Sequence, residues 1–230
     1  MTGAAEPSTP RNFVERLDAD IVPTLLGLGR ARTHPARSIL FLEGDDAHTV
    51  HIIRAGMVKV SVTVAGREVI LDVLGPGDLL GEMSVLDEGR RSATATTLSK
   101  VESSTIPAPA FQEFLAAQPS ATSHLMSEVV RRLRDASRRQ VEYGALDGVG
   151  RVCGRLVEMV DRFGRRSGGL VVIDGPLTQT DIAAWAGLSR EAVVKALQSM
   201  RALGWIRTNP RSISVLDEGA VRSRASFSDG

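Results

Sequence analysis

The chain has 230 residues, of which 43% are hydrophobic, and a formal net charge of +1 at pH 7. This length allows two small domains or one large one, and the lack of any apolar run of about 18 residues predicts no transmembrane helix. The small net charge hides an asymmetry, because residues 131–230 carry 17 basic and 11 acidic side chains, whereas residues 1–130 carry 11 and 16. A basic half joined to an acidic half indicates that only the C-terminal half meets a polyanion.

Several functional classes leave short motifs that this sequence lacks. GxSxG, HExxH, the P-loop and GxGxxG are all absent, so we expect no enzyme. The single cysteine, Cys153, excludes an internal disulfide and a four-cysteine metal site within one chain, and the four histidines are scattered, so we expect no metal. The N-terminus has neither the basic start nor the apolar core of a secretory signal. We therefore expect a cytoplasmic protein with no membrane partner.

The first folded part is expected to span residues 13–115, after a flexible tail over residues 1–12. Glycine-rich turns, AGRE and GPGD among them, divide this part into short strands. One segment shows the alternation of a strand with one buried face, with Val58, Val60, Val62 and Val64 separated by Lys59, Ser61 and Thr63. Several short strands at such spacing predict a small antiparallel barrel or jelly roll.

A helical stretch follows from Ala110 to about Tyr143, with apolar residues at three-to-four spacing and arginines around them. A helix of about 25 residues is about 38 Å long, too long for the barrel alone to cover. It either bridges two domains or forms a two-stranded coiled coil between two copies of the chain. We favour the dimer, because Ser137 lies inside the apolar seam, where a polar side chain is costly without a ligand or a second chain beside it.

The next stretch, GALDGVG (144–150), contains three glycines and predicts a hinge. A helix over Arg151–Phe163, the loop GRRSGG and the short strand LVVID are expected after it. LTQTDIAAWAGLSREAVVKALQSMRALGWIRT then fits a helix-turn-helix, in which Thr178 caps the first helix and Ser189 the second. A two-stranded wing with a turn at Asn209–Pro210 and a tail over residues 218–230 complete the chain.

A generic helical hairpin with solvated charges is the alternative to the helix-turn-helix. The spacing of alanine, glycine and inner apolar residues favours the helix-turn-helix, with Gly187 at the turn. The outward positions that open its second helix are Arg190, Glu191 and Lys195. Arginine and lysine donate to guanine, and glutamate accepts from cytosine, so these residue types can read base edges.

Three motifs in order, GEMS…RRSATA, DGVGRV and LTQTDIAAWAGLSREAVVKAL, make the chain resemble the cyclic-AMP receptor protein/fumarate-nitrate regulator (CRP/FNR) family of bacterial transcription factors. The resemblance covers about residues 15–217 and implies an α+β fold. Its parts would be an N-terminal antiparallel β jelly-roll that binds a cyclic nucleotide (13–115), a long dimerisation helix (116–143), a hinge (144–150) and a C-terminal winged helix-turn-helix domain (151–217).

In that family the Gly-Glu and Arg-Ser pairs form a phosphate-binding cassette. Carried over, Glu82 would accept from the ribose 2′-hydroxyl and Arg91 would pair with the cyclic phosphate. The chemistry agrees, because a buried monoanion needs a charge-assisted donor, and a glutamate beside a phosphate needs a hydroxyl to accept from. The expected nucleotide-binding residues are Leu71, Gly81, Glu82, Met83, Arg91, Ser92, Ala93, Arg132 and Ser137.

Family members also hold the base through two adjacent polar residues of the dimer helix, one of them from the partner subunit. These positions read Ala136 and Ser137 here, and Ala136 has no hydroxyl. The resemblance implies cyclic AMP as the effector, but the missing hydroxyl at Ala136 leaves open whether cyclic AMP, cyclic GMP or another effector binds. Branches of the family with an iron–sulfur cluster need four cysteines, which this chain lacks.

The resemblance places base reading on Arg190, Glu191 and Lys195, and contacts to phosphates on Thr178 and Thr180, with Ser189 in the same DNA-binding set. A homodimer would bind palindromic double-stranded DNA with half-sites close to TGTGA, and RNA polymerase would be a further partner. Two other function classes remain. One is a regulator of the same fold that acts without ligand or answers another effector. The other is a nucleotide-binding module that governs an attached enzyme or partner.

Overall fold

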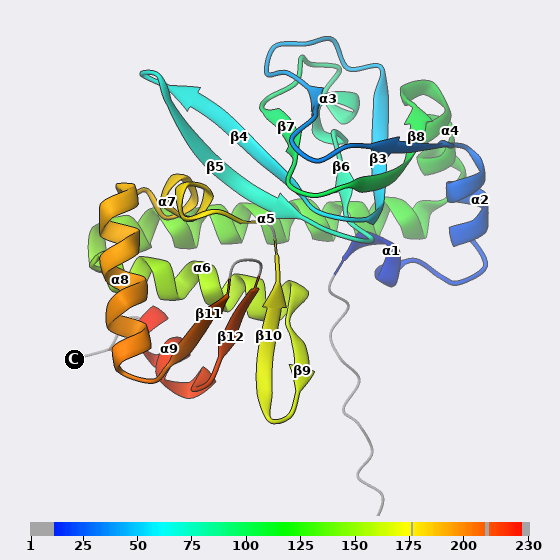
Figure 1. Ribbon diagram of the computed structural model, residues 1–230. Coiled ribbons are helices and arrows are strands. Elements are labelled where there is room, and N and C mark those ends of the chain that lie inside the picture. The colour runs from blue at the N-terminus through cyan, green and yellow to red at the C-terminus, as the bar shows by residue number, and fades with distance from the viewer. Residues whose placement is uncertain (1–11, 176, 210–211, 227–230) are drawn as a thin grey trace, which may run out of the picture.

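The computed structural model describes residues 12–175, 177–209 and 212–226, and Figure 1 shows a β-roll, a long helix behind it and a C-terminal domain. Two short helices, α1 (Phe13–Arg16) and α2 (Val22–Gly27), open the described chain. The roll then consists of the short helix α3 (Met83–Leu86) and the strands β1 (Arg30–His34), β2 (Ile39–Phe41), β3 (Thr49–Ala55), β4 (Val58–Val64), β5 (Arg67–Leu74), β6 (Leu79–Leu80), β7 (Thr94–Thr97) and β8 (Val101–Pro107).

The strands of the roll form two four-stranded antiparallel sheets, in the orders β1-β8-β3-β6 and β2-β7-β4-β5. Strands that are distant in sequence are therefore neighbours, as the predicted jelly roll requires. Apolar side chains from both sheets fill the interior, among them Ile53, Val58 and Ala95, which are at most 1% exposed. Ile52 and Leu79 are buried in a separate cluster, with apolar residues of the helices such as Phe13 and Phe111. The predicted fold of the N-terminal domain is confirmed.

The helical stretch predicted from Ala110 to Tyr143 is two helices rather than one, α4 (Ala108–Ala117) and α5 (Pro119–Ala145). The break lies at Gln118, whose φ of −128° and ψ of 82° are not helical. A residue that precedes proline is pushed out of the α region, and proline is favoured at the first position of the next helix. Pro119 therefore sets the true start of the long helix.

The predicted hinge over 144–150 is also wrong in its extent. Helix α5 continues through Gly144 to Ala145, and α6 (Gly148–Phe163) begins after only two intervening residues. Asp147 caps α6 by accepting from the amide of Gly150 at 2.9 Å. Glycine has a low helix propensity, but packing and this cap leave only Leu146 and Asp147 outside a helix.

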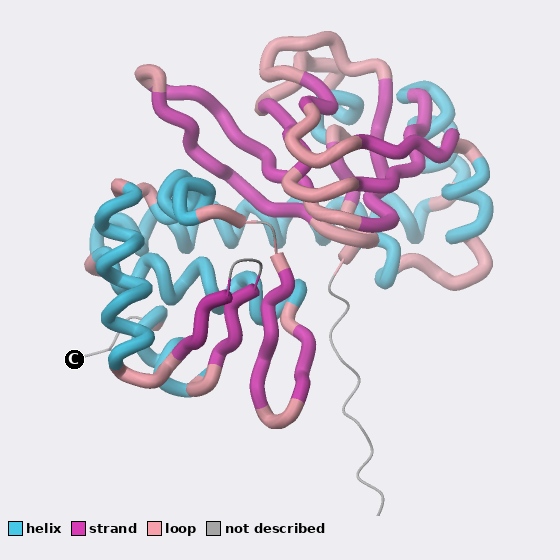
Figure 2. The backbone as a smooth tube through the Cα atoms, in the orientation of Figure 1, coloured by secondary structure: helices cyan, strands magenta, loops and turns pink. Residues whose placement is uncertain are grey.

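The C-terminal domain contains a four-stranded antiparallel sheet in the order β11-β12-β10-β9, with helices packed around it (Figure 2). After α6 its elements are β9 (Arg165–Ser167), β10 (Leu170–Asp174), α7 (Gln179–Ala186), α8 (Arg190–Ala202), β11 (Ile206–Asn209), β12 (Ser212–Val215) and α9 (Glu218–Ala225). Part of the predicted loop GRRSGG is thus strand β9, which pairs with β10. The wing strands are confirmed, while the predicted turn residue Pro210 lies outside the described residues.

The C-terminal tail predicted over 218–230 is a helix, α9, as far as Ala225. Asp217 caps it by accepting from the amide of Ala220 at 2.8 Å, and Val221 is 1% exposed against the rest of the domain. A single buried apolar residue in a polar segment gives little periodicity, so the pattern of this sequence hides the helix. The N-terminal tail predicted over 1–12 falls on residues 1–11, which lie outside the described residues, and on Asn12, which caps α1.

The helix-turn-helix has the local structure that its sequence predicts. Thr178 and Asp181 form a reciprocal capping box at the start of α7. Gly187 ends that helix with a φ of +63°, a conformation that glycine adopts without strain. Ser189 caps α8 by accepting from the amide of Ala192 at 3.2 Å. Helices α7 and α8 are therefore positioned by signals within about 25 residues of sequence.

The β4–β5 hairpin of the roll lies over α7, so the two domains share one apolar core (Figure 1). Ile70 and Val73 of β5 belong to the same buried cluster as Ile182 and Trp185 of α7. The second domain thus covers the outer face of the hairpin, and Lys59 on that face is only 7% exposed. The prediction of one buried face is wrong for the first part of this strand, where Val58, Lys59 and Ser61 are all buried, while Thr63 and Val64 near the hairpin turn are exposed.

The apolar seam of α5 lies on an exposed face of the described chain. Met126, Val130, Leu133 and Val141 are each at least 40% exposed. Single exposed apolar residues are ordinary, but four along one helix form a stripe at the spacing of a helix-packing surface. The stripe is therefore a candidate surface for packing against a second chain.

Candidate functional site

The predicted phosphate-binding cassette is built where β6 ends and the chain returns through α3 towards β7. Gly81 has a φ of +83°, and a Cβ at this position would collide with the Arg91 guanidinium. Arg91 is 4% exposed and donates to the carbonyl oxygens of Gly81 at 2.7 Å and Thr49 at 2.5 Å. Its guanidinium also lies 4.2 Å from the centre of the Phe41 ring. Gly81 is therefore the residue that lets Arg91 approach the backbone.

The charge of Arg91 is incompletely balanced within the described chain. Among the described residues, no carboxylate forms a salt bridge with Arg91, and its buried Nε has no hydrogen-bond partner. Burial lowers the pKa of Arg91, although Glu82 and Asp45 favour its charged form. Arginine stays protonated in proteins all the same, and a buried cation without a counter-ion is costly. An anion that enters the cassette would meet a preformed partner.

Glu82, the other predicted anchor, is 1% exposed and is held by the long helix. Arg132 of α5 donates to Glu82 at 2.7 Å, to Glu128 at 3.1 Å and to the carbonyl oxygen of Leu79 at 2.7 Å. Burial raises the pKa of Glu82, and Arg132 opposes that rise. The pair therefore joins the cassette to α5.

The cavity at the cassette brings most of the predicted nucleotide-binding residues together. Its lining contains Gly81, Glu82, Met83, Arg91, Ser92, Ala93 and Arg132. It also contains Phe41 and Val60, which our sequence analysis missed because they come from distant strands that carry no motif. The cavity encloses about 50 Å³, whereas ligand pockets usually start at about 300 Å³. The cavity is thus narrower than a usual ligand pocket, and we call this narrow arrangement the contracted cassette.

Two predicted nucleotide-binding residues are not brought to this cavity by the described chain. Leu71 is 41% exposed and is the extra residue of a bulge on β5, where Val60 pairs with Asp72 and Ser61 with Ile70. Ser137 lies on the exposed side of α5, and its hydroxyl donates to the carbonyl oxygen of Leu133 at 3.0 Å. A role for Ser137 therefore depends on a second copy of the chain.

The predicted DNA-contacting side chains are exposed to solvent in the structure. Arg190, Glu191 and Lys195 of α8 are exposed, as are Thr178 and Thr180 at the start of α7. Hydrogen bonds from its own backbone and from Ser189 lower the pKa of Glu191. Its carboxylate is therefore ionised at neutral pH and can accept from a base donor.

Two arginines that the sequence motifs do not single out join the elements of the helix-turn-helix to their neighbours. Arg201, in the last turn of α8, donates to the hydroxyl of Thr208 in β11 at 2.8 Å. Arg151 of α6 donates to the carbonyl oxygen of Gly187 at 3.2 Å and lies 5.7 Å from the Tyr143 ring. These contacts tie the recognition helix to the wing, and the turn between the two helices to α5 and α6.

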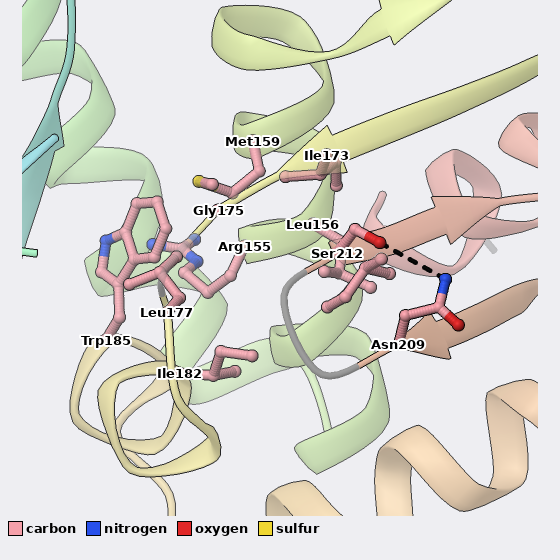
Figure 3. A pocket seen from close by; sticks show the side chains of 11 residues that line it. Arg155, Leu156, Met159, Ile173, Gly175, Leu177, Ile182, Trp185, Asn209 and Ser212 are labelled. Carbon is pink, nitrogen blue, oxygen red and sulfur yellow. Dashed lines mark hydrogen bonds between the residues drawn. The ribbon is translucent and has the colours of Figure 1, made fainter. Parts of the chain in front are cut away.

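A second cavity lies inside the C-terminal domain, between α6, α7 and the wing strands (Figure 3). Arg155 and Trp185 stand at one end of it, and the Asn209 amide donates to Ser212 at 3.4 Å at the other. It encloses about 50 Å³, again well below the volume of usual ligand pockets, about 300 Å³. We therefore interpret it as a packing gap of the DNA-binding domain.

Within residues 12–175, 177–209 and 212–226, no three or more His, Cys, Asp or Glu side chains gather closely enough to hold a metal ion. None of the helices that the structure describes has the length and apolar character needed to cross a membrane. Cys153 is buried, and burial raises the pKa of its thiol to about 11.

Comparison with known proteins divides the chain in the same way. The family model described as a cyclic nucleotide-binding domain matches residues 31–118, and the one described as a Crp-like helix-turn-helix domain matches residues 150–224. A CRP-like cAMP-activated global transcriptional regulator of Mycobacterium tuberculosis is 34% identical over 192 residues, which cover 83% of this chain and 86% of the relative. The cyclic AMP receptor protein of Thermus thermophilus is 30% identical over 208 residues, which cover 89% and 92%.

A solved structure extends the similarity to the whole fold. The c-di-GMP responsive global regulator CLP of Xanthomonas campestris superposes with a TM-score of 0.72 at 21% identity, over 86% of this chain and 99% of that one. An identity this low supports the fold alone. The same fold therefore occurs in a c-di-GMP responsive regulator as well as in cAMP-activated ones. The fold alone does not identify the effector of this chain.

Proposed function

Because the chain belongs to the CRP/FNR family of bacterial transcription regulators, we propose that a cyclic nucleotide, with cyclic AMP as the first candidate, controls how it binds DNA. DNA-binding regulation follows from the family, and the chain is not an enzyme. Control by cyclic AMP, the palindromic TGTGA-like target and the homodimer are our proposals. RNA polymerase is proposed as a further partner, from the family resemblance alone.

The observation that carries the proposal is the buried guanidinium of Arg91. It lies against Gly81, where any side chain would collide with it, and it forms no salt bridge with a described carboxylate. The buried carboxylate of Glu82 lines the same cavity. A ligand that pairs with both side chains must offer an anion to the Arg91 guanidinium and a hydroxyl donor to the Glu82 carboxylate. A ribose cyclic phosphate carries both groups on one rigid ring. Ser92, Met83 and Ala93 complete the proposed contact set, together with Arg132 once it exchanges partners.

Calorimetric titration with cyclic AMP, cyclic GMP and cyclic di-GMP is the test of the effector. We expect cyclic AMP to bind most tightly, and a promoter fragment to shift at lower protein concentration when cyclic AMP is present. Equal DNA binding with and without every nucleotide would instead support a regulator that acts without ligand. A response to cyclic di-GMP alone would support the same fold with a different effector.

The exposed apolar stripe on α5 supports the proposed homodimer. A second copy of α5 packed in a coiled coil would bury Met126, Leu133 and Val141 and bring the partner's Ser137 near the base. Ser137→Ala is then expected to weaken the nucleotide dependence of DNA binding more than DNA binding itself. Ser127→Ala is the matched control, because Ser127 also donates to a backbone carbonyl four residues earlier at 3.0 Å. An equal response in the two variants would contradict the role of Ser137.

Base reading is proposed for the exposed start of α8. Two recognition helices in a dimer would meet half-sites about one helical turn, or roughly 34 Å, apart. Arg190 would read a guanine, Glu191 the cytosine opposite a guanine, and Lys195 a nearby guanine with looser discrimination, since ammonium lacks the fork of guanidinium.

Arg190→Ala is expected to cost about 1–3 kcal/mol of binding free energy and to relax specificity at one base pair of each half-site. The measurement is selection from random duplexes with the wild type and the variant. Thr180→Ala is the control, because a phosphate contact carries no sequence information. It is preferred to a change at Thr178, whose hydroxyl caps α7. An unchanged motif at unchanged stringency in Arg190→Ala would rule out this reading of α8.

A further inference from the structure

The contact between the β-roll and the helix-turn-helix has a buried ionic centre. Lys59 of β4 lies 3.0 Å from Asp181 of α7, and Arg37 lies 3.3 Å from the other oxygen of the same carboxylate. The side chains of Lys59 and Asp181 are 9% and 4% exposed. We name Arg37, Lys59 and Asp181 the interdomain clasp. Residues far apart in sequence thus join the nucleotide-binding domain directly to the DNA-binding domain.

Asp181 has a second task at the same place. As the third residue of α7 it accepts from the hydroxyl of Thr178 at 2.6 Å and from its amide at 2.9 Å. Burial alone would raise the pKa of Asp181, but hydrogen bonds from Thr178, Lys59 and Arg37 outweigh it and lower that pKa. Arg37 and Lys59 therefore bind the same Asp181 carboxylate that caps the start of α7.

The other end of the clasp is the wall of the cassette. Successive side chains of a strand point to opposite faces of its sheet, so Lys59 and Val60 leave β4 in opposite directions. Val60 lines the cavity at Arg91, while Lys59 enters the clasp. On the outer face, Glu68 of β5 accepts hydrogen bonds from Lys59 at 2.6 Å and from Ser61 at 2.8 Å, so it links β5 to two side chains of β4. Movement of the wall at Val60 must therefore move Lys59.

The contracted cassette and the closed clasp occur together in this structure. A cavity of about 50 Å³ has to widen before it holds a nucleotide, and β4 is one of its walls. We propose that Lys59 is a positioning residue that stabilises this contracted arrangement, and that a nucleotide in the cassette loosens the clasp and frees α7 to reorient. This inference rests on the proposed nucleotide control, since it assigns the contact that such control acts upon.

Linkage gives the proposal a measurable sign. A ligand shifts an equilibrium only through its different affinities for the two states, and the coupling between two sites is reciprocal. If nucleotide binding opposes the closed clasp, opening the clasp by mutation must tighten nucleotide binding. It must also raise the affinity for DNA in the absence of nucleotide, because the freed arrangement is then populated without ligand.

The test compares Lys59→Met, which keeps the length of the side chain and removes its charge, with the full-length wild type. We expect cyclic AMP to bind about fivefold or more tightly to Lys59→Met, at the low end of known couplings of about 5- to 150-fold. The ratio of DNA affinities with and without cyclic AMP is expected to fall by a similar factor, through stronger binding without the nucleotide. Lys59→Arg should restore wild-type values, because a cation returns to the clasp.

Lys100→Met is the matched control, since the Lys100 side chain is 70% exposed and lies outside the clasp. If Lys59→Met does not fold, Arg37→Gln is used instead, because the Arg37 side chain is 46% exposed and its replacement is better tolerated. We then expect the same tighter binding of cyclic AMP and the same stronger DNA binding without nucleotide, each with a smaller fold-change. Unchanged or weaker nucleotide affinity in the variant that folds overturns the clasp. A wild type that binds neither cyclic AMP nor cyclic GMP instead overturns the proposed nucleotide control.

Discussion

Replacing Arg155 with methionine is expected to lower the free energy of unfolding by about 3–5 kcal/mol, because it leaves a buried carboxylate without its cation. Arg155 is 2% exposed. It pairs with Glu142 at the end of α5 and with Glu158 at 2.9 Å within α6, and its guanidinium lies 5.7 Å from the centre of the Trp185 ring. Three helices therefore meet at this one side chain.

Urea unfolding at a fixed protein concentration measures the effect, because the stability of an oligomer depends on concentration. Arg222→Met is the control, since the Arg222 side chain is 40% exposed and also pairs with two carboxylates, Asp161 and Glu218. Exposed pairs contribute only about 0–1 kcal/mol, so Arg222→Met should change stability little. If Arg155→Met lowers the free energy of unfolding by less than about 1 kcal/mol, the buried carboxylates do not depend on the Arg155 cation, and the prediction is wrong.

Arg91→Ala is expected to abolish measurable nucleotide binding while the protein stays folded. Truncating one partner of a desolvated charge pair costs about 2–5 kcal/mol, or roughly 30- to 4,000-fold in affinity. The cost applies here because Arg91 is buried at the cassette and is the proposed partner of the phosphate. Calorimetry with cyclic AMP measures the loss, and thermal unfolding checks that the variant folds.

Arg90→Ala is the neighbouring control for that experiment. The Arg90 side chain is 73% exposed and makes a long salt bridge of 3.5 Å to Asp46, away from the lining of the cassette cavity. Its variant should bind cyclic AMP with nearly wild-type affinity. Full affinity in Arg91→Ala would remove the cassette assignment, whereas an equal loss in both variants would point to damage to the loop rather than to the phosphate contact.

Much of this architecture is readable from sequence because its signals are local. The capping box at Thr178, the positive φ at Gly187 and the cap at Ser189 all act within a few residues, so the predicted helix-turn-helix agrees with the structure. Most of the residues predicted from the cassette pairs line one cavity, while their role in binding a nucleotide stays a prediction. The predicted boundaries of the long helix and the hinge were less accurate, because α5 begins at Pro119 and only two residues separate it from α6.

What the sequence determined by itself is the order of the domains, their strand and helix periodicities and the chemistry of each motif. Only the tertiary structure decided which surfaces are covered. Lys59 looks like a solvent-facing residue of an alternating strand, yet it is 7% exposed, because the helix-turn-helix packs on the outer face of the β4–β5 hairpin. Alternation distinguishes the two faces of a strand, but it cannot predict that a second domain packs on the outer face and brings Asp181, 122 residues later in the chain, into contact with Lys59.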